Sequence, residues 1–257
     1  MTKDLTTGKI MPLLIRFTIP LVLGNLFQLT YNAADSMIVG HFVGKEALAA
    51  VGICNPISTL MILFLNGLCM GAGILMGIQY GAKDYDTLRR QISTTMLSGV
   101  IFSMILSAAC ILFARPILIL MQADSSILTM TTAYLRIIFT GLVFTFLYNF
   151  FSSTLRALGD SSTPLYFLIA SALLNIVGDL FFVVVLGAGS NGCAVATGLS
   201  AACSVSSISR KKCRFYALAG TGSSLTARFS PALSPMAGLP LYSRQPFSLA
   251  SSASRQS

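Results

Sequence analysis

Charged residues are scarce in this sequence. Asp, Glu, Lys and Arg together supply 10% of the 257 residues, whereas hydrophobic residues supply 54% and the mean hydropathy is +0.79. Soluble domains carry about 25% charged residues, so this composition excludes an ordinary soluble domain. The chain instead has hydrophobic runs of about 20 residues, the length that crosses a bilayer as a helix. The sequence therefore predicts an all-α polytopic membrane protein.

Paired cysteines are also lacking. None of the six cysteines forms a CxxC pair or another spacing typical of metal ligands, and four lie in or beside hydrophobic stretches, where a thiol behaves as a small apolar group. They are Cys54, Cys69, Cys110, Cys193, Cys203 and Cys213. This pattern indicates neither a disulfide framework nor a metal site.

Acidic residues are missing from the C-terminal part of the chain. Residues 1–200 contribute +2 to the net charge of +9, and the stretch from Arg210 to Arg255 contributes +7. From Ala201 onward, serine fills 14 of 57 positions and prolines interrupt every hydrophobic run, so no span fits there. A basic excess of this kind can bind nucleic acid or anionic lipid. We expect neither role for this stretch, and no nucleic-acid partner for the chain.

Residues 201–257 have two possible origins. One is a genuine Ser-rich, basic and disordered tail, which is common at the ends of membrane proteins. The second is a frameshift, because the hydrophobic pattern is lost abruptly in the middle of a sixth helix. Read one base earlier, the codons from Met236 to Arg244 permit a segment that resembles the start of another membrane helix. We favour the frameshift.

Long hydrophobic runs bounded by charge predict five full transmembrane helices and a truncated sixth. The five lie near residues 12–39, 47–78, 91–114, 126–153 and 164–187, and the sixth begins near Asn191. The chain then divides into a polar N-terminal segment (1–11), a helical lobe (12–200) and the tail (201–257). The N-terminal segment is polar and mixed in charge, and the hydrophobic segment after it is too long for a signal-peptide core, so the N-terminus should stay uncleaved.

The distribution of Lys and Arg predicts the orientation of the spans. If the N-terminus is cytoplasmic, the inner segments collect seven of these residues and the outer segments at most three. Basic residues favour the cytoplasmic side of short loops. We therefore expect a multi-pass protein of the plasma (inner) membrane with its N-terminus in the cytoplasm.

Two acidic residues, Asp35 and Asp179, lie inside the predicted spans. A charge at bilayer depth costs about 2.5–3.5 kcal/mol on insertion scales, so such residues are functional candidates. Asp35 falls late in the first span, Asp179 falls past the middle of the fifth, and Thr197 falls early in the sixth. Asn175 precedes Asp179 by one helical turn and shares its face. At about 1.5 Å per residue, these positions converge at one depth in the outer half of the membrane.

The predicted cluster of oxygen atoms has two possible uses. It could bind Na⁺ through carboxylate, amide and hydroxyl oxygens, or it could hold a proton shared between the two carboxylates. Either cation would remove the repulsion between Asp35 and Asp179 and let their helices close or bend. The structural alternative is that Asp35 ends the first helix at the headgroup level and Asp179 only hydrogen-bonds a neighbouring helix.

A few more side chains have weaker claims to function. Gln28, Tyr31 and Tyr148 could line a substrate cavity, although packing or lipid contact accounts for them more readily. Paired intramembrane aspartates also serve proteolysis, but Ile176 replaces the first glycine that such a motif needs before Gly178-Asp179. We therefore expect no enzyme and no cofactor.

Several short motifs resemble those of the multidrug and toxic compound extrusion (MATE) family. Each is weak alone, but their order and spacing over residues 10–197 are specific. They are Ile19-Pro20, Gly24-Asn25-Leu26-Phe27-Gln28, Tyr31-Asn32-Ala33-Ala34-Asp35, Gly77-Ile78-Gln79-Tyr80-Gly81, Arg156-Ala157-Leu158-Gly159-Asp160 with Thr163-Pro164, and Asn175-Ile176-Val177-Gly178-Asp179.

The resemblance implies a twelve-helix transporter with two six-helix lobes, of which this chain holds only the first. Such proteins are expected to export drugs or other amphipathic organic compounds in exchange for Na⁺ or H⁺. The residues that match the family's cation site are Asp35, Asn175, Asp179 and Thr197. Two alternatives stay open: a flippase for lipid-linked oligosaccharides with a related architecture, and a membrane scaffold or binding protein that transports nothing.

Overall fold

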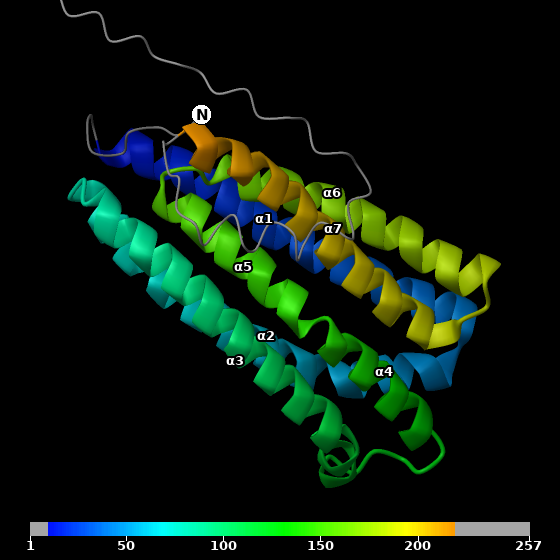
Figure 1. Ribbon diagram of the computed structural model, residues 1–257. Coiled ribbons are helices and arrows are strands. Elements are labelled where there is room, and N and C mark those ends of the chain that lie inside the picture. The colour runs from blue at the N-terminus through cyan, green and yellow to red at the C-terminus, as the bar shows by residue number, and fades with distance from the viewer. Residues whose placement is uncertain (1–9, 219–257) are drawn as a thin grey trace, which may run out of the picture. The chain divides into compact units, whose positions relative to one another are not determined.

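The computed structural model describes residues 10–218, which are helical apart from short turns. Figure 1 shows α1 (Ile10–Ile38), α2 (Lys45–Gly81), α3 (Tyr85–Leu120), α4 (Leu128–Thr140), α5 (Leu142–Ala157), α6 (Ser162–Leu180) and α7 (Gly189–Leu218). Two π-helical turns, η1 (Val39–Val43) and η2 (Phe181–Val185), extend α1 and α6. The packing below concerns residues 10–212, since the end of α7 belongs to a second unit.

Five segments are long and apolar enough to cross a membrane, which confirms the predicted number of full spans. Four of them are α1 with η1, α2, α3, and α6 with η2. The fifth combines α4 and α5, which are separated only by Gly141. α7 begins at Gly189, close to the predicted start of the sixth helix, but it continues to Leu218, past the boundary predicted at residue 200. The tail prediction for residues 219–257 lies outside the described residues, as does that for residues 1–9.

The turn between α2 and α3 is fixed by local hydrogen bonds. Lys83 has a φ of 60°, and the backbone N–H of Asp84 donates to the carbonyl of Gln79 at 3.1 Å, which closes the end of α2. The carboxylate of Asp84 then accepts a hydrogen bond from the backbone N–H of Thr87 at 3.1 Å and caps α3. One acidic residue thus ends one helix and starts the next.

The turn between α5 and α6 repeats this construction. Gly159 has a φ of 84°, and the N–H of Asp160 donates to the carbonyl of Leu155 at 2.9 Å. The carboxylate of Asp160 accepts from the N–H of Thr163 at 3.0 Å and from its hydroxyl at 2.6 Å. Both turns therefore use an Asp and a Thr three residues later, and each joins two successive spans through a short connection.

The hydrophobic core lies among α2, α3, α4 and α5. α2 packs against α4 and α5, and α3 packs against the same two helices. Large apolar side chains from all four helices are fully buried there, namely Leu65, Met76, Leu118, Leu135, Phe139, Leu142 and Phe150. Most of the buried apolar side chains of the lobe therefore lie among these four helices.

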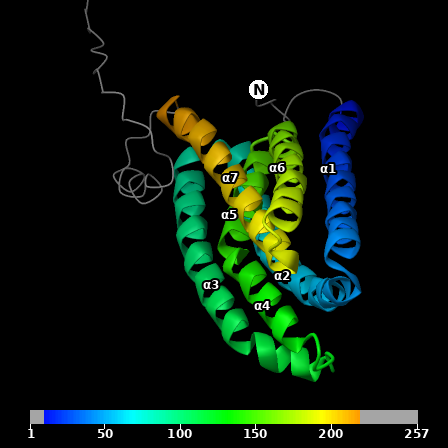
Figure 2. The same ribbon diagram turned by 90° about the vertical axis from the view of Figure 1, so that its right-hand side faces the viewer.

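α1 is held differently. It lies along α6, as Figure 2 shows, and its most hydrophobic stretch has 0% of its residues buried. In contrast, 33% of the corresponding stretch of α2 is buried. Pro20 also removes a backbone hydrogen bond within α1. α1 is therefore the span with the fewest internal constraints among those described, and α6 is the helix that holds it.

Candidate functional site

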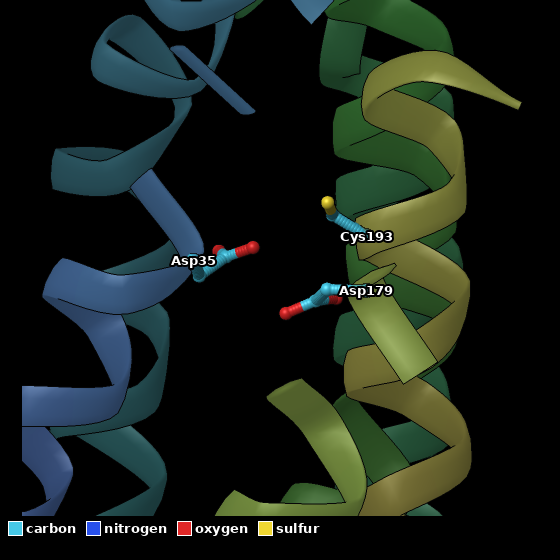
Figure 3. Close-up of side chains that lie close together, drawn as sticks. All are labelled: Asp35, Asp179 and Cys193. Atoms are coloured by element: carbon cyan, nitrogen blue, oxygen red, sulfur yellow. The ribbon is translucent and has the colours of Figure 1, made fainter. Parts of the chain in front are cut away.

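The two intramembrane aspartates face one another across the contact between α1 and α6. The π-helical turns η1 and η2 pack together, which draws the ends of the two helices toward each other just after Asp35 and Asp179. A carboxylate oxygen of each aspartate and the Sγ of Cys193 all lie within 4.8 Å of one another. Figure 3 shows Asp35 pointing across the gap toward Asp179 and Cys193. π-helical turns are frequent at functional sites, and here they follow both acids.

Asp179 is buried without the partners that a buried carboxylate normally has. Its exposed fraction is 0%, and neither of its carboxylate oxygens has a hydrogen-bond partner among the described residues. Oδ1 of Asp35 is buried and without a partner in the described part of the chain as well. Buried polar groups are almost always hydrogen-bonded, because an unpaired one costs about 1–3 kcal/mol and a charged one costs more. The described residues therefore leave both aspartates with an unsatisfied acceptor oxygen.

Asn175 and Thr197 form a second level of the same site, one helical turn from Asp179 and Cys193. Nδ2 of Asn175 donates to Oγ1 of Thr197 at 3.2 Å, and this bond joins α6 to α7. The Thr197 hydroxyl donates to the backbone carbonyl of Cys193 at 3.0 Å. Oδ1 of Asn175 is buried and has no hydrogen-bond partner within residues 10–218. The structure thus brings together the four residues of the predicted cluster, and it leaves another acceptor oxygen available.

Two glycines allow α6 and α7 to approach this closely. A Cβ atom at Gly178 would lie 3.0 Å from the Cβ of Ala196, and one at Gly192 would lie 2.8 Å from the Cβ of Phe182. Small residues let helix backbones approach in membranes. Because Gly178 precedes Asp179 and Gly192 precedes Cys193, the close approach is located at the site itself.

Cys193 is a site residue that the sequence reasoning missed. The cysteine pattern indicated no metal site, but the structure places the buried Cys193 thiol beside two carboxylates. Three more buried thiols have ordinary partners: Cys54 lies 3.7 Å from the carbonyl of Thr131, Cys69 lies 4.0 Å from that of Phe146, and Cys110 lies 3.7 Å from the Met61 sulfur. The sequence did contain one indication of its role: Cys193 lies one helical turn before Thr197, a predicted site residue, and therefore shares its helix face.

The residues predicted for a substrate cavity come from α1 and α5. Gln28 and Tyr31 share a face of α1 with Asp35, and Tyr148 belongs to α5. A separate hollow of about 480 Å³ between α2, α3 and α5 is lined by different residues, among them Phe64, Gly99 and Phe146. The part of Gln28, Tyr31 and Tyr148 in substrate binding stays a prediction.

The acids in the turns contrast with those in the spans. Hydrogen bonds from the side chain and the backbone of Thr87 lower the pKa of Asp84, and hydrogen bonds from the backbone and the side chain of Ser126 lower the pKa of Asp124. These carboxylates are satisfied and solvated. They therefore give no sign of a ligand.

Comparisons with known proteins show the family of the chain. The MatE family model matches residues 20–181, more than half of the chain, and the chain belongs to this family. The "Probable multidrug resistance protein YpnP" of Bacillus subtilis (strain 168) is 32% identical over 197 residues, which cover 77% of this chain and 44% of that protein.

Two solved structures show the same fold. One is titled "Crystal structure of MATE in the bent conformation" (TM-score 0.73, 27% identity, 78% of this chain and 44% of that chain). The second is titled "Crystal structure of MATE in the straight conformation" (TM-score 0.67, 27% identity, 76% of this chain and 43% of that chain). The chain thus spans less than half the length of these relatives, and it is a multi-pass membrane protein with the architecture of one lobe.

Proposed function

We propose that this chain forms the first lobe of a cation-coupled antiporter that exports drugs or other amphipathic organic compounds in exchange for Na⁺ or H⁺. The observation that carries the proposal is the pair of aspartates from α1 and α6, with buried carboxylate oxygens that lack hydrogen-bond partners among the described residues. Asn175 and Thr197 add an amide and a hydroxyl oxygen one turn away. Carboxylate, amide and hydroxyl oxygens are suitable ligands for a hard cation.

The coupling mechanism follows from how α1 is held. With no cation, two negative charges repel each other across the contact between α1 and α6. A bound Na⁺ or proton removes that repulsion and favours the conformation in which the two helices are close. Because the cation binds this conformation better than one in which α1 has moved away, it shifts the population between them. α1 is suited to such movement, since its hydrophobic stretch has 0% of its residues buried and Pro20 interrupts its hydrogen bonding.

Two solved relatives support the existence of two conformations. Those proteins are described in a bent and in a straight conformation. In this chain we assign the corresponding change to α1. The organic solute would bind beside Gln28, Tyr31 and Tyr148, next to the cation site, in the cavity that a second lobe completes. The lobe would lie in the plasma membrane with its N-terminus in the cytoplasm.

Cation binding by the chain itself tests the proposal. We expect the purified chain in lipid nanodiscs to bind ²²Na⁺, or else to release protons when an unbuffered sample is shifted from acid to neutral pH. Asp35→Asn and Asp179→Asn should each remove this binding, since each deletes a charged ligand. The matched control is Asp86→Asn, which makes the same chemical change at an acid whose side chain is 91% exposed.

Transport supplies the second readout. Proteoliposomes that contain the chain joined to a second lobe should export a fluorescent organic cation only when a Na⁺ or proton gradient is imposed. Which gradient drives export identifies the coupling ion. If Asp35→Asn and Asp179→Asn leave gradient-driven export intact, the assigned role of the pair is wrong. Binding of a protein partner without solute flux would favour the scaffold alternative.

A further inference from the structure

We propose that Asp35, Asp179 and Cys193 also form a binding site for a soft divalent metal ion of the zinc group, Zn²⁺ or Cd²⁺, which holds α1 against α6 and α7. The proposal rests on the same place as the cation site of the proposed function. It depends on a different ligand, the thiol of Cys193. Na⁺ prefers oxygen ligands, whereas Zn²⁺ and Cd²⁺ bind sulfur strongly.

The ligand set fits the ion. One ligand atom from each of the three residues lies within 4.8 Å of the other two. Tetrahedral Zn²⁺ with bonds of about 2.0 Å to oxygen and about 2.3 Å to sulfur places its ligands about 3.3–3.5 Å apart. Side-chain rotation can close the remaining gap. Cys193 would bind as the thiolate and release its proton to solvent, and with one of the two carboxylates protonated the ligands balance the charge of the divalent ion. A fourth position stays open for water or for a group from Asn175.

The burial of Asp179 independently points to a ligand. Its side chain is 0% exposed, both of its oxygens lack hydrogen-bond partners among the described residues, and Figure 3 shows it directed toward the gap that Asp35 faces. The Cys193 side chain is 0% exposed and borders the same gap. The buried Cys54, Cys69 and Cys110 instead contact a carbonyl oxygen or a thioether sulfur. Among these buried thiols, Cys193 is therefore the one that is placed to bind a metal.

A metal ion bound at this site would hold α1 against α6 and α7. Its three ligands come from α1, α6 and α7, and α1 has little further burial to hold it. An ion that joins all three would fix α1 in the closed position. In an antiporter that moves α1 during each cycle, such an ion would act as an inhibitor that competes with the coupling cation.

Cd²⁺ binding to the full chain tests the proposal. The chain in nanodiscs, with Cys203 and Cys213 replaced by serine to remove competing thiols, is titrated with Cd²⁺, and the ultraviolet charge-transfer band of the Cd²⁺–thiolate bond is followed. We expect one Cd²⁺ per chain with this band. Cys193→Ser should weaken Cd²⁺ binding by about 100-fold or more, since loss of even an outer partner of a metal ligand costs about 10–100-fold. Cys69→Ser, a matched change at another buried thiol, should leave the binding unchanged.

The unfolding temperature provides a second readout of the same site. Cd²⁺ should raise the unfolding temperature of the chain with native Cys193 but not that of Cys193→Ser or Asp35→Asn, because a ligand stabilises only the state that binds it. A Cd²⁺ band that persists in Cys193→Ser, or one that is lost in Cys69→Ser, would overturn the metal site.

The metal site and the proposed function fail separately. Loss of Na⁺ or proton binding in Asp35→Asn together with full Cd²⁺ binding in Cys193→Ser would support the antiporter and reject the metal site. Unchanged Na⁺ and proton binding in Asp35→Asn together with loss of Cd²⁺ binding in Cys193→Ser would support the metal site and reject the antiporter.

Discussion

Two groups of acidic residues in this lobe have opposite surroundings. Asp84, Asp124 and Asp160 lie in turns, where each carboxylate accepts hydrogen bonds from a residue two or three positions further along the chain. Asp35 and Asp179 lie in spans, where buried carboxylate oxygens have no partner among the described residues. The first group contributes to the stability of the turns. The second group costs stability, and such a cost indicates a ligand or a conformational change that offsets it.

Replacement of Asp179 should have the largest effect on stability, and it should distinguish the acids in the spans most clearly from those in the turns. In the absence of added cations, Asp179→Asn should raise the free energy of unfolding by about 2 kcal/mol, because it removes a buried charge that costs about 2.5–3.5 kcal/mol at bilayer depth. The same variant should lose cation binding. Reversible unfolding in mixed detergent micelles measures the first effect. A clear loss of stability would place Asp179 with the structural acids of the turns and so end the distinction between the two groups.

The approach of α6 and α7 should matter to the buried acids and not to the turns. A Cβ at Gly178 would lie 3.0 Å from that of Ala196, so Gly178→Val should cost about 2 kcal/mol through overpacking and should weaken cation binding. Gly71→Val is the matched control, since a Cβ at Gly71 would meet nothing within 4 Å. Unfolding and ²²Na⁺ or proton binding are measured on both variants. Equal effects of the two changes would show that backbone propensity, and not helix approach, is responsible.

Loss of a turn acid should change stability in the opposite direction from loss of Asp179. Asp160→Ala removes the carboxylate that accepts from the N–H of Thr163 in the first turn of α6, and it should lower the free energy of unfolding by about 1 kcal/mol. Asp160→Ser should restore most of it, because serine is also a good cap. Cation binding should be the same in both variants, and a loss of binding would show that the turn contributes to the site.

The smallest effect concerns the pH dependence of the turn at Asp84. Hydrogen bonds from Thr87 lower the pKa of Asp84 below its usual value of 3.8 in the folded chain. Its contribution is therefore fully present above the unfolded pKa of about 3.9 and is lost as the pH falls through the lower folded value. The difference in unfolding temperature between the native chain and Asp84→Ala should thus shrink below about pH 4. A difference that stays constant from neutral pH down to about pH 3 would contradict the capping role.

Much of the fold could be predicted from hydropathy. The five full spans agree with the predicted ones to within several residues, because a span must be apolar over the thickness of the bilayer. The predicted ends were less accurate. α3 extends from Tyr85 to Leu120, whereas the prediction covered only 91–114, since helices continue past the bilayer into residues such as Arg89 and Arg90 that hydropathy excludes.

Interruptions within the spans could not be predicted in the same way. The break at Gly141 divides one long hydrophobic segment into α4 and α5, and a Cβ at this glycine would lie 3.7 Å from the Cα of Gly198 in α7. α7 likewise runs to Leu218 although hydropathy falls after residue 200, because helix formation depends on the backbone and hydropathy does not report it. Neither feature can be read from hydropathy along the segment.

The sequence by itself determined which residues are chemically unusual: two acids in spans and an amide one turn before the second of them. Those features are local, because a charge in a hydrophobic run can be read along the chain. Only the tertiary structure decided which of these residues meet. The packing of η1 on η2 and the glycines at the contact of α6 and α7 place Asp35, Asp179 and Cys193 together. Distances between helices depend on side-chain volumes at every contact, and no single segment contains that information.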